Sequence, residues 1–148
     1  MQQSFRKLKR VKPIIKLKQT RVDSEAELLS RIRDEKIAVV KTMKESQKKY
    51  MDGVDQLNQL RTSKDRSNLT TFESAIDHVK EQWWQLYRKV QEIERREKAQ
   101  MNQLLIAERE LKSIEKLREQ YESEFQAETK RIEQKNVDEL ALRKFTVR

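Results

Sequence analysis

The side chains that most often carry out catalysis are scarce in this sequence. It contains no cysteine, which excludes thiolate nucleophiles, thiolate metal ligands and disulfides, and it contains a single histidine, His78. No serine nucleophile is suggestively placed near His78, and no second histidine is present to help bind a metal. One glycine cannot build a phosphate-binding loop. The residue types therefore predict a protein that is not an enzyme and that uses no cofactor or metal.

The carboxylates are numerous, but their spacing suits helix surfaces better than acid–base chemistry. Many acidic residues stand four positions before a basic one, as in Glu92–Arg96, Glu94–Lys98 and Glu108–Lys112. Such pairs stabilise a helix by only about 0.2–0.5 kcal/mol each. Shifted carboxylate pKa values usually need a water-excluding cleft, which a two-helix rod does not provide. We therefore interpret most of these residues as solvated helix faces.

Two adjacent tryptophans are more informative. Neighbouring residues on a helix point about 100° apart, so if Trp83 continues the apolar stripe of Val79 and Leu86, then Trp84 must leave it. Tyr87 lies three residues beyond Trp84 and on the same side. An exposed Trp–Tyr pair could anchor a protein partner. The alternative is that Trp84 folds back over the edge of the stripe and widens the core.

Positive charge is concentrated at the N-terminal end. The net charge is +9, and residues 1–22 contain eight Lys and Arg residues and no acid, which leaves 9 − 8 = +1 for the rest of the chain. A segment of this kind attracts acidic proteins, nucleic acid or anionic lipid. It could equally be a solubilising tail. The sequence alone leaves both interpretations open.

The apolar residues that must position these features recur with coiled-coil spacing. The chain is 35% hydrophobic and 40% charged, with one proline, Pro13. After Pro13 an apolar row with a spacing of seven is interrupted only at Lys36, and a second row with alternating spacings of three and four follows Thr71. The first row is Ile15, Val22, Leu29, Met43, Tyr50 and Leu57, and the second begins Phe72, Ile76, Val79, Trp83, Leu86, Val90 and Ile93. This spacing keeps one narrow stripe facing a partner helix.

We therefore predict an all-α fold: a long antiparallel two-helix coiled-coil hairpin whose second helix is longer than the first. Pro13 suits the first turn of a helix, and Thr70 with Glu73 has the spacing of a capping box. Gly53 costs roughly 1 kcal/mol relative to alanine and marks a soft spot rather than a break. The predicted division is a basic lead that is flexible or loosely helical (1–12), a first helix (13–61), a turn (62–70), a second helix (71–145) and a tail (146–148).

The unequal helices leave a C-terminal overhang. Ile132, Leu140 and Leu142 cannot all be covered by a first helix that has already ended. They must either dock on a partner or fray.

Stretches near both ends of the chain resemble the FliJ family of the flagellar type III export apparatus. These stretches are Phe5-Arg6-Lys7-Leu8, Ile14-Ile15-Lys16-Leu17-Lys18, Glu115-Lys116-Leu117-Arg118-Glu119 and Glu133-Gln134-Lys135-Asn136-Val137-Asp138-Glu139-Leu140-Ala141. The resemblance implies a cytoplasmic, non-enzymatic stalk, peripheral at the inner face of the membrane and largely monomeric alone. Its implied partners are the hexameric export ATPase, which it would activate, the export-gate membrane protein and export chaperones.

The resemblance also implies two sets of binding residues. The set for the ATPase ring is Ile14, Ile15, Leu17, Lys18, Gln134, Asp138, Glu139, Leu140 and Leu142. The set for the export gate is Phe72, Ala75, Ile76, Val79, Trp83, Trp84 and Tyr87.

Other functions remain open at this point. Injectisome stalk proteins share the same architecture. A basic lead followed by heptads is also the outline of a nucleic-acid-binding bZIP protein. Pro13 interrupts that basic stretch, and residues 6–21 lack the asparagine that would contact bases. The stalk interpretation is therefore preferred, with no nucleic acid among the expected partners.

Overall fold

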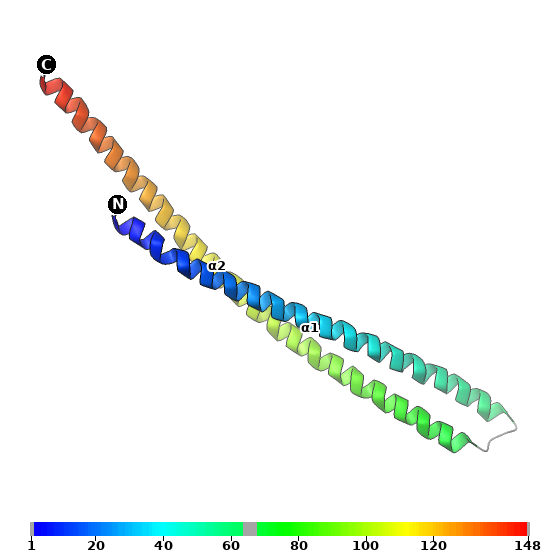
Figure 1. The fold of residues 1–148 in the computed structure, drawn as a ribbon. Coiled ribbons are helices and arrows are strands. Elements are labelled where there is room, and N and C mark those ends of the chain that lie inside the picture. Colours follow the sequence, from blue (N-terminus) through cyan, green and yellow to red (C-terminus); the bar gives the residue numbers. More distant parts are fainter. Residues whose placement is uncertain (1, 64–67, 148) are drawn as a thin grey trace. The chain divides into compact units, whose positions relative to one another are not determined.

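The computed structural model describes residues 2–63 and 68–147, which form two helices (Figure 1). Helix α1 spans Gln2–Thr62 and helix α2 spans Leu69–Val147. They pack against each other and run antiparallel, and α2 has 79 residues against 61 in α1. The predicted all-α fold with a longer second helix is confirmed.

Of the two states expected for the N-terminal lead, flexible or loosely helical, the structure shows a helix. Helix α1 begins at Gln2 and continues through Pro13, so residues 2–12 are helical. A proline inside a helix removes one backbone hydrogen bond and costs about 3 kcal/mol. Packing against α2 offsets this cost, because Val11 is buried and the Phe5 ring lies 6.2 Å from the Phe125 ring.

The helix ends near the turn differ by a few residues from the predicted ones. Ser63 N–H donates to the Leu60 carbonyl oxygen over 3.1 Å, directly after α1 ends. The Phe72 N–H donates to the Asn68 carbonyl oxygen over 3.0 Å, so Thr70 lies inside α2 rather than at its cap. Of the expected turn 62–70, residues 64–67 lie outside the described part of the chain. At the other end α2 continues through Val147, into the expected tail, and the last residue of that tail is not described.

The chain divides into two units, and each has its own packing. Unit 1 comprises residues 1–25 and 103–148, and unit 2 comprises residues 26–102. In unit 2, Val39, Val90 and Ile93 form a buried cluster. The residues packed around this cluster are Ile32, Val40, Met43 and Leu86. Leu29 and Leu57 of the predicted first row are buried as well.

Two residues of α1 in unit 2, Lys36 in the first row and Gly53 beside it, have local explanations. Lys36 interrupts the first row, and its Nζ lies 3.7 Å from an oxygen of Glu94 and 3.5 Å from an oxygen of Glu97 on α2. Gly53 leaves α1 unbroken, and a Cβ added there would lie 3.2 Å from Cγ1 of Ile76. The ion pairs accommodate the cation at the seam, and the missing side chain lets α2 approach closely.

The ion pairs also correct part of the sequence interpretation. Glu94 and Arg96 were expected to pair along α2, yet both form ion pairs with α1. Glu94 contacts Lys36, and the Arg96 guanidinium lies 3.2 Å from the Glu35 carboxylate. These charges therefore connect the two helices of unit 2 rather than only solvating one face.

In unit 1 the helices are paired only along part of α2. Val11, Ala107 and Leu111 are buried between them. Further along α2, the Lys7 ammonium lies 5.3 Å from the centre of the Tyr121 ring. Beyond this, residues 130–146 of α2 are all exposed. Figure 1 shows the red end of α2 continuing past the blue start of α1. We call residues 130–146 the C-terminal segment.

Candidate binding surfaces

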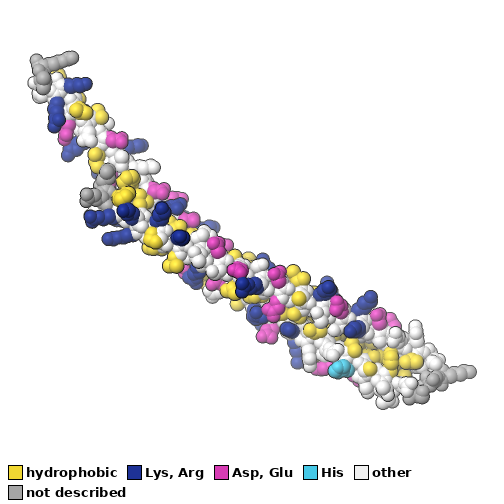
Figure 2. Space-filling view, in the orientation of Figure 1, with side chains coloured by type: hydrophobic (Ala, Val, Ile, Leu, Met, Phe, Trp, Pro, Cys, Tyr) yellow, Lys and Arg dark blue, Asp and Glu magenta, His cyan; other side chains and the backbone are white. Residues whose placement is uncertain are grey.

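The C-terminal segment carries large apolar side chains that no described part of the chain covers. These side chains are Ile132, Val137, Leu140, Leu142 and Phe145, and Phe145 is 83% exposed. Figure 2 shows hydrophobic side chains between charged ones along this part of the molecule. An isolated exposed leucine is ordinary. Five large exposed apolar residues within four turns are typical of a surface that binds a partner.

These apolar residues do not form a single stripe. With 3.6 residues per turn, Leu140, Val137, Phe145 and Leu142 point about 80°, 140°, 220° and 280° around the helix from Ile132. Charged residues stand between them, so apolar and charged side chains alternate around the helix. One groove could cover only part of this surface, so the arrangement suits a partner that surrounds the helix.

The expected polar members of the ring-binding set lie on the same segment. The Gln134 side-chain amide donates to the Asp138 carboxylate over 3.1 Å, one turn away on the same helix. Glu139 is exposed next to Leu140. These carboxylates are therefore presented to solvent beside the apolar residues.

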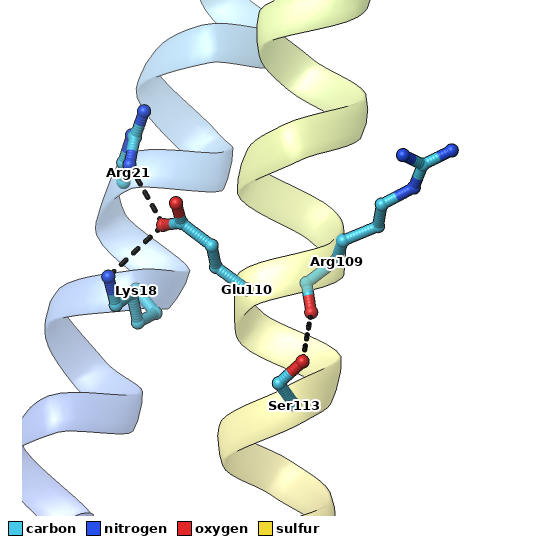
Figure 3. Close-up of polar contacts among 5 residues, drawn as sticks. All are labelled: Lys18, Arg21, Arg109, Glu110 and Ser113. Atoms are coloured by element: carbon cyan, nitrogen blue, oxygen red, sulfur yellow. Dashed lines mark hydrogen bonds and ion pairs between the residues drawn. The ribbon is translucent and has the colours of Figure 1, made fainter.

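The N-terminal members of that set are placed differently. Ile14 and Leu17 are exposed, whereas Ile15 is half-buried against α2. Lys18 Nζ lies 3.1 Å from an oxygen of Glu110, and Arg21 Nη1 lies 2.8 Å from the same oxygen (Figure 3). Lys18 is thus already bound to α2 through an ion pair within unit 1.

These two cations change the acidity of the carboxylate between them. The hydrogen bond from Lys18 and the positive charge of Arg21 hold the pKa of Glu110 below its ordinary value. Beside it, the Ser113 hydroxyl donates to the Arg109 carbonyl over 3.0 Å, which is a local bond within α2. Sequence reasoning missed the role of Glu110, because no spacing rule links it to a residue about ninety positions earlier.

The structure does not bring the two halves of the expected ring-binding set together. Lys18 contacts Glu110, and Gln134 follows Glu110 by 24 residues on α2. At 1.5 Å per residue these two positions lie about 36 Å apart along the helix. The two halves would therefore meet different parts of a partner.

Of the two adjacent tryptophans, Trp83 faces α1 and Trp84 faces solvent. The Trp83 ring stacks on Tyr50 of α1 with centroids 5.7 Å apart, which confirms its place in the seam. Trp84 is 47% exposed and stacks on Tyr87 of the same helix at 5.5 Å. The Arg88 guanidinium lies 5.5 Å from the centre of the Trp84 ring. Trp84 therefore does not fold back over the seam, and it forms an exposed aromatic pair with Tyr87.

The other members of the expected gate-binding set have mixed exposure. Ile76 is buried against α1, Phe72 and Val79 are half-buried, and Ala75 is exposed. A shallow hollow of about 540 Å³ lies along α2 beside Trp83 and Trp84, lined also by Asp77, Lys80 and Glu81. Ala75, Trp84 and Tyr87 are thus the members most accessible to a partner.

Histidine and carboxylate groups show no catalytic arrangement within residues 2–63 and 68–147. His78 is exposed, and its Nε2 lies 3.2 Å from the Gln82 side-chain nitrogen. No three metal-ligating side chains of the described residues gather at one point. Neither helix, where described, contains a stretch long and apolar enough to cross a membrane.

Comparison with known proteins gives one match, to a family model. The model described as flagellar FliJ protein matches residues 7–148, nearly the whole chain. No curated protein and no solved structure matches the sequence. The matched region includes all but the first five residues of α1, the whole of α2 and the C-terminal segment. The chain therefore belongs to the FliJ family of flagellar proteins.

Proposed function

We propose that this protein is a non-enzymatic stalk that binds the hexameric export ATPase and links it to the export gate. Membership of the FliJ family implies a stalk protein of the flagellar type III export apparatus. The observation that carries the finer proposal is the C-terminal segment, with exposed apolar side chains on every side of one unpaired helix. Export chaperones are further proposed partners, and the proposed location is the cytoplasmic face of the membrane.

A ring of six subunits provides the enclosing partner that this segment needs. A helix with its side chains is about 10–12 Å across, and side chains pointing in all directions can each reach a different subunit. Val137, Leu140, Leu142 and Phe145 would supply the apolar contacts, while Asp138 and Glu139 would contact basic groups of the ring. Any effect on ATP turnover would be a binding effect, in which the stalk favours one arrangement of the ring over others.

The proposed gate contact is the exposed pair of Trp84 and Tyr87, together with Ala75. Stacked aromatic side chains offer a rigid apolar surface, and such residues often dominate binding energy at interfaces. Arg88 beside Trp84 adds a cation to this surface. Ile76 is buried against α1, so we leave it out of the proposed gate contact and assign it to the packing of α2 against α1.

The ring contact can be tested by removing residues 133–148. We expect the truncated protein to lose co-sedimentation with the assembled ATPase and to lose any stimulation of ATP hydrolysis. Its helix content per residue should stay unchanged by circular dichroism, because residues 133–146 are all exposed. Retained ring binding by the truncated protein would refute the assignment.

Two triple variants of the full-length chain test whether ring binding depends on the apolar side chains or only on the length of the segment. The triple change Leu140→Ala, Leu142→Ala and Phe145→Ala keeps the helix propensity and removes the apolar groups. The matched triple Lys130→Ala, Arg131→Ala and Lys135→Ala removes only exposed charges from the same segment. We expect the first triple to weaken ring binding at least about tenfold and the second to change it much less.

The gate contact can be tested with Trp84→Ala combined with Tyr87→Ala. We expect weaker binding to the cytoplasmic part of the gate and little change in melting temperature, since both side chains are exposed. Trp83→Ala is the matched control. It should lower the melting temperature, because Trp83 stacks on Tyr50 across the two helices. A large fall in melting temperature for the double variant would show that the pair supports the fold instead.

A further inference from the structure

A groove along α1 in unit 2 belongs to neither proposed contact. It has a volume of about 630 Å³, and the apolar side chains that line it are Ile37 and Val40. Arg33, Lys41 and Lys44 line it from α1, and the paired Lys36 and Glu97 complete it from both helices. Sequence reasoning missed this groove, because Ile37 stands next to the heptad row and not in it.

One of the apolar side chains that line the groove, Ile37, is largely exposed. Ile37 is 68% exposed, although it follows a seam position directly. Val40 packs against the buried cluster of Val39, Val90 and Ile93, so the floor beneath the groove is fixed by the core. An exposed isoleucine on such a floor offers a contact that only an apolar side chain of a partner would fill.

Three of the cations that line the rim of the groove are not neutralised by any carboxylate of residues 2–63 and 68–147. Arg33, Lys41 and Lys44 lie four residues before, four after and seven after Ile37, which places them along one side of the helix. None of the three forms an ion pair with any carboxylate of the described residues, whereas Lys36 is paired with Glu94 and Glu97. From Arg33 to Lys44 the rim extends about 17 Å, or three helical turns.

We propose that this groove binds an acidic amphipathic helix of another protein. The shape favours a helix, because a cylinder fits the concave side of two packed helices and adds a third to them. The charge favours acidic flanks, because carboxylates on such a helix would reach the three unpaired cations while its apolar face covers Ile37 and Val40. A flat anionic membrane would meet the tips of the lysines but would not fill the groove.

Two synthetic peptides test the proposal on the full-length chain. The first is a helix of about sixteen residues, spanning about 24 Å, with leucines at positions i, i+3, i+4 and i+7 and glutamates flanking them. The second has the same composition in scrambled order, so its charge is unchanged and its apolar stripe is lost. We expect the amphipathic peptide to bind at least about tenfold tighter by fluorescence anisotropy and to lose affinity as salt is added.

Variants then place the binding at the groove. Lys41→Glu with Lys44→Glu should weaken binding of the amphipathic peptide at least about tenfold. Lys112→Glu with Lys116→Glu makes the same charge change at two exposed positions of α2 outside the groove, and it should weaken binding less than about threefold. Ile37→Asn should weaken binding several-fold, and its control Ile106→Asn, also at an exposed isoleucine, should not. All four changes are at exposed positions, so the melting temperatures should stay close to that of the unchanged protein.

Four outcomes would overturn the proposal. One is the absence of binding of the amphipathic peptide at millimolar concentration, and another is equal weakening by both charge-reversed pairs. A third is binding to phosphatidylglycerol vesicles that depends on Lys41 and Lys44 while the two peptides bind alike, which would assign the groove to a membrane. The last is a dimer in sedimentation that the Lys41 and Lys44 change abolishes, which would place a second copy of this chain there.

Discussion

Two regions of the same helix, α2, show how a neighbouring helix changes the burial of apolar side chains. Around Ile93, apolar side chains face α1 and are buried, and Ile93 itself is only 1% exposed. In the C-terminal segment, comparable side chains have no helix opposite them, and Phe145 is 83% exposed. Both regions are helical along their whole length. The helix is therefore a local property of the sequence, whereas burial depends on where α1 begins.

The charges of the two regions differ in the same way. Around Ile93, Lys36 and Arg96 take part in ion pairs that join the two helices. In the C-terminal segment, the bond from Gln134 to Asp138 stays within one helix. Apolar and polar groups of the first region thus stabilise the fold, and those of the second are left available for partners.

The largest expected contrast between these regions is in stability. Ile93→Ala should lower the free energy of unfolding by about 2–5 kcal/mol, because it leaves a cavity in the cluster with Val39 and Val90. Leu140→Ala in the C-terminal segment should change it by less than about 0.5 kcal/mol. Urea denaturation followed by circular dichroism measures both. Similar losses for the two variants would show that the C-terminal segment is covered in solution.

A smaller effect is expected at Lys36, the exception within the buried region. Lys36→Leu completes the apolar row between Leu29 and Met43 and removes a cation from the seam. Replacing a partly buried ion pair by a well-packed apolar group is often neutral or stabilising, so we expect a gain of about 1 kcal/mol in the same urea measurement. The control is Lys41→Leu, where the exposed side chain has no seam to fill and no gain is expected. A marked loss in Lys36→Leu would mean that the pairs with Glu94 and Glu97 contribute more than the packing.

The sequence could predict the features that depend on local spacing. The seven-residue row correctly placed Leu29 and Leu57 in the core, and the 3-4 spacing correctly placed Trp83 in the seam while the exposure of Trp84 stayed open. The sequence left open whether residues 2–12 are helical, because Pro13 disfavours a helix locally and the compensating contacts come from residues near Phe125. The groove at Ile37 was missed because Ile37 stands outside the heptad row, and the sequence does not show which cations beside it lack a carboxylate partner among the described residues.

The smallest expected effect concerns Glu110, which joins the paired parts of unit 1. Its folded pKa lies below the ordinary value because Lys18 and Arg21 bind the charged form. The ion pairs therefore contribute fully above the unfolded glutamate pKa of about 4.3. Their contribution is lost as the pH falls through the lower folded pKa. Glu110→Gln should thus lower the melting temperature slightly near neutral pH. On acidification, the melting temperature of this variant should fall less than that of the unchanged protein.

The measurement is the difference in melting temperature between about pH 7 and about pH 3, a range that begins above the unfolded glutamate pKa and ends below it. Glu139→Gln is the control, because Glu139 lies in the C-terminal segment with no helix opposite it and should leave the melting temperature near neutral pH unchanged. An unchanged acid sensitivity in Glu110→Gln would mean that other carboxylates dominate it and that Glu110 adds little to the pairing. A reduced sensitivity would show that the paired part of unit 1 depends on a charge contact that the C-terminal segment lacks. In that case acid would loosen the paired part while leaving the segment, already without a neighbouring helix, as it is.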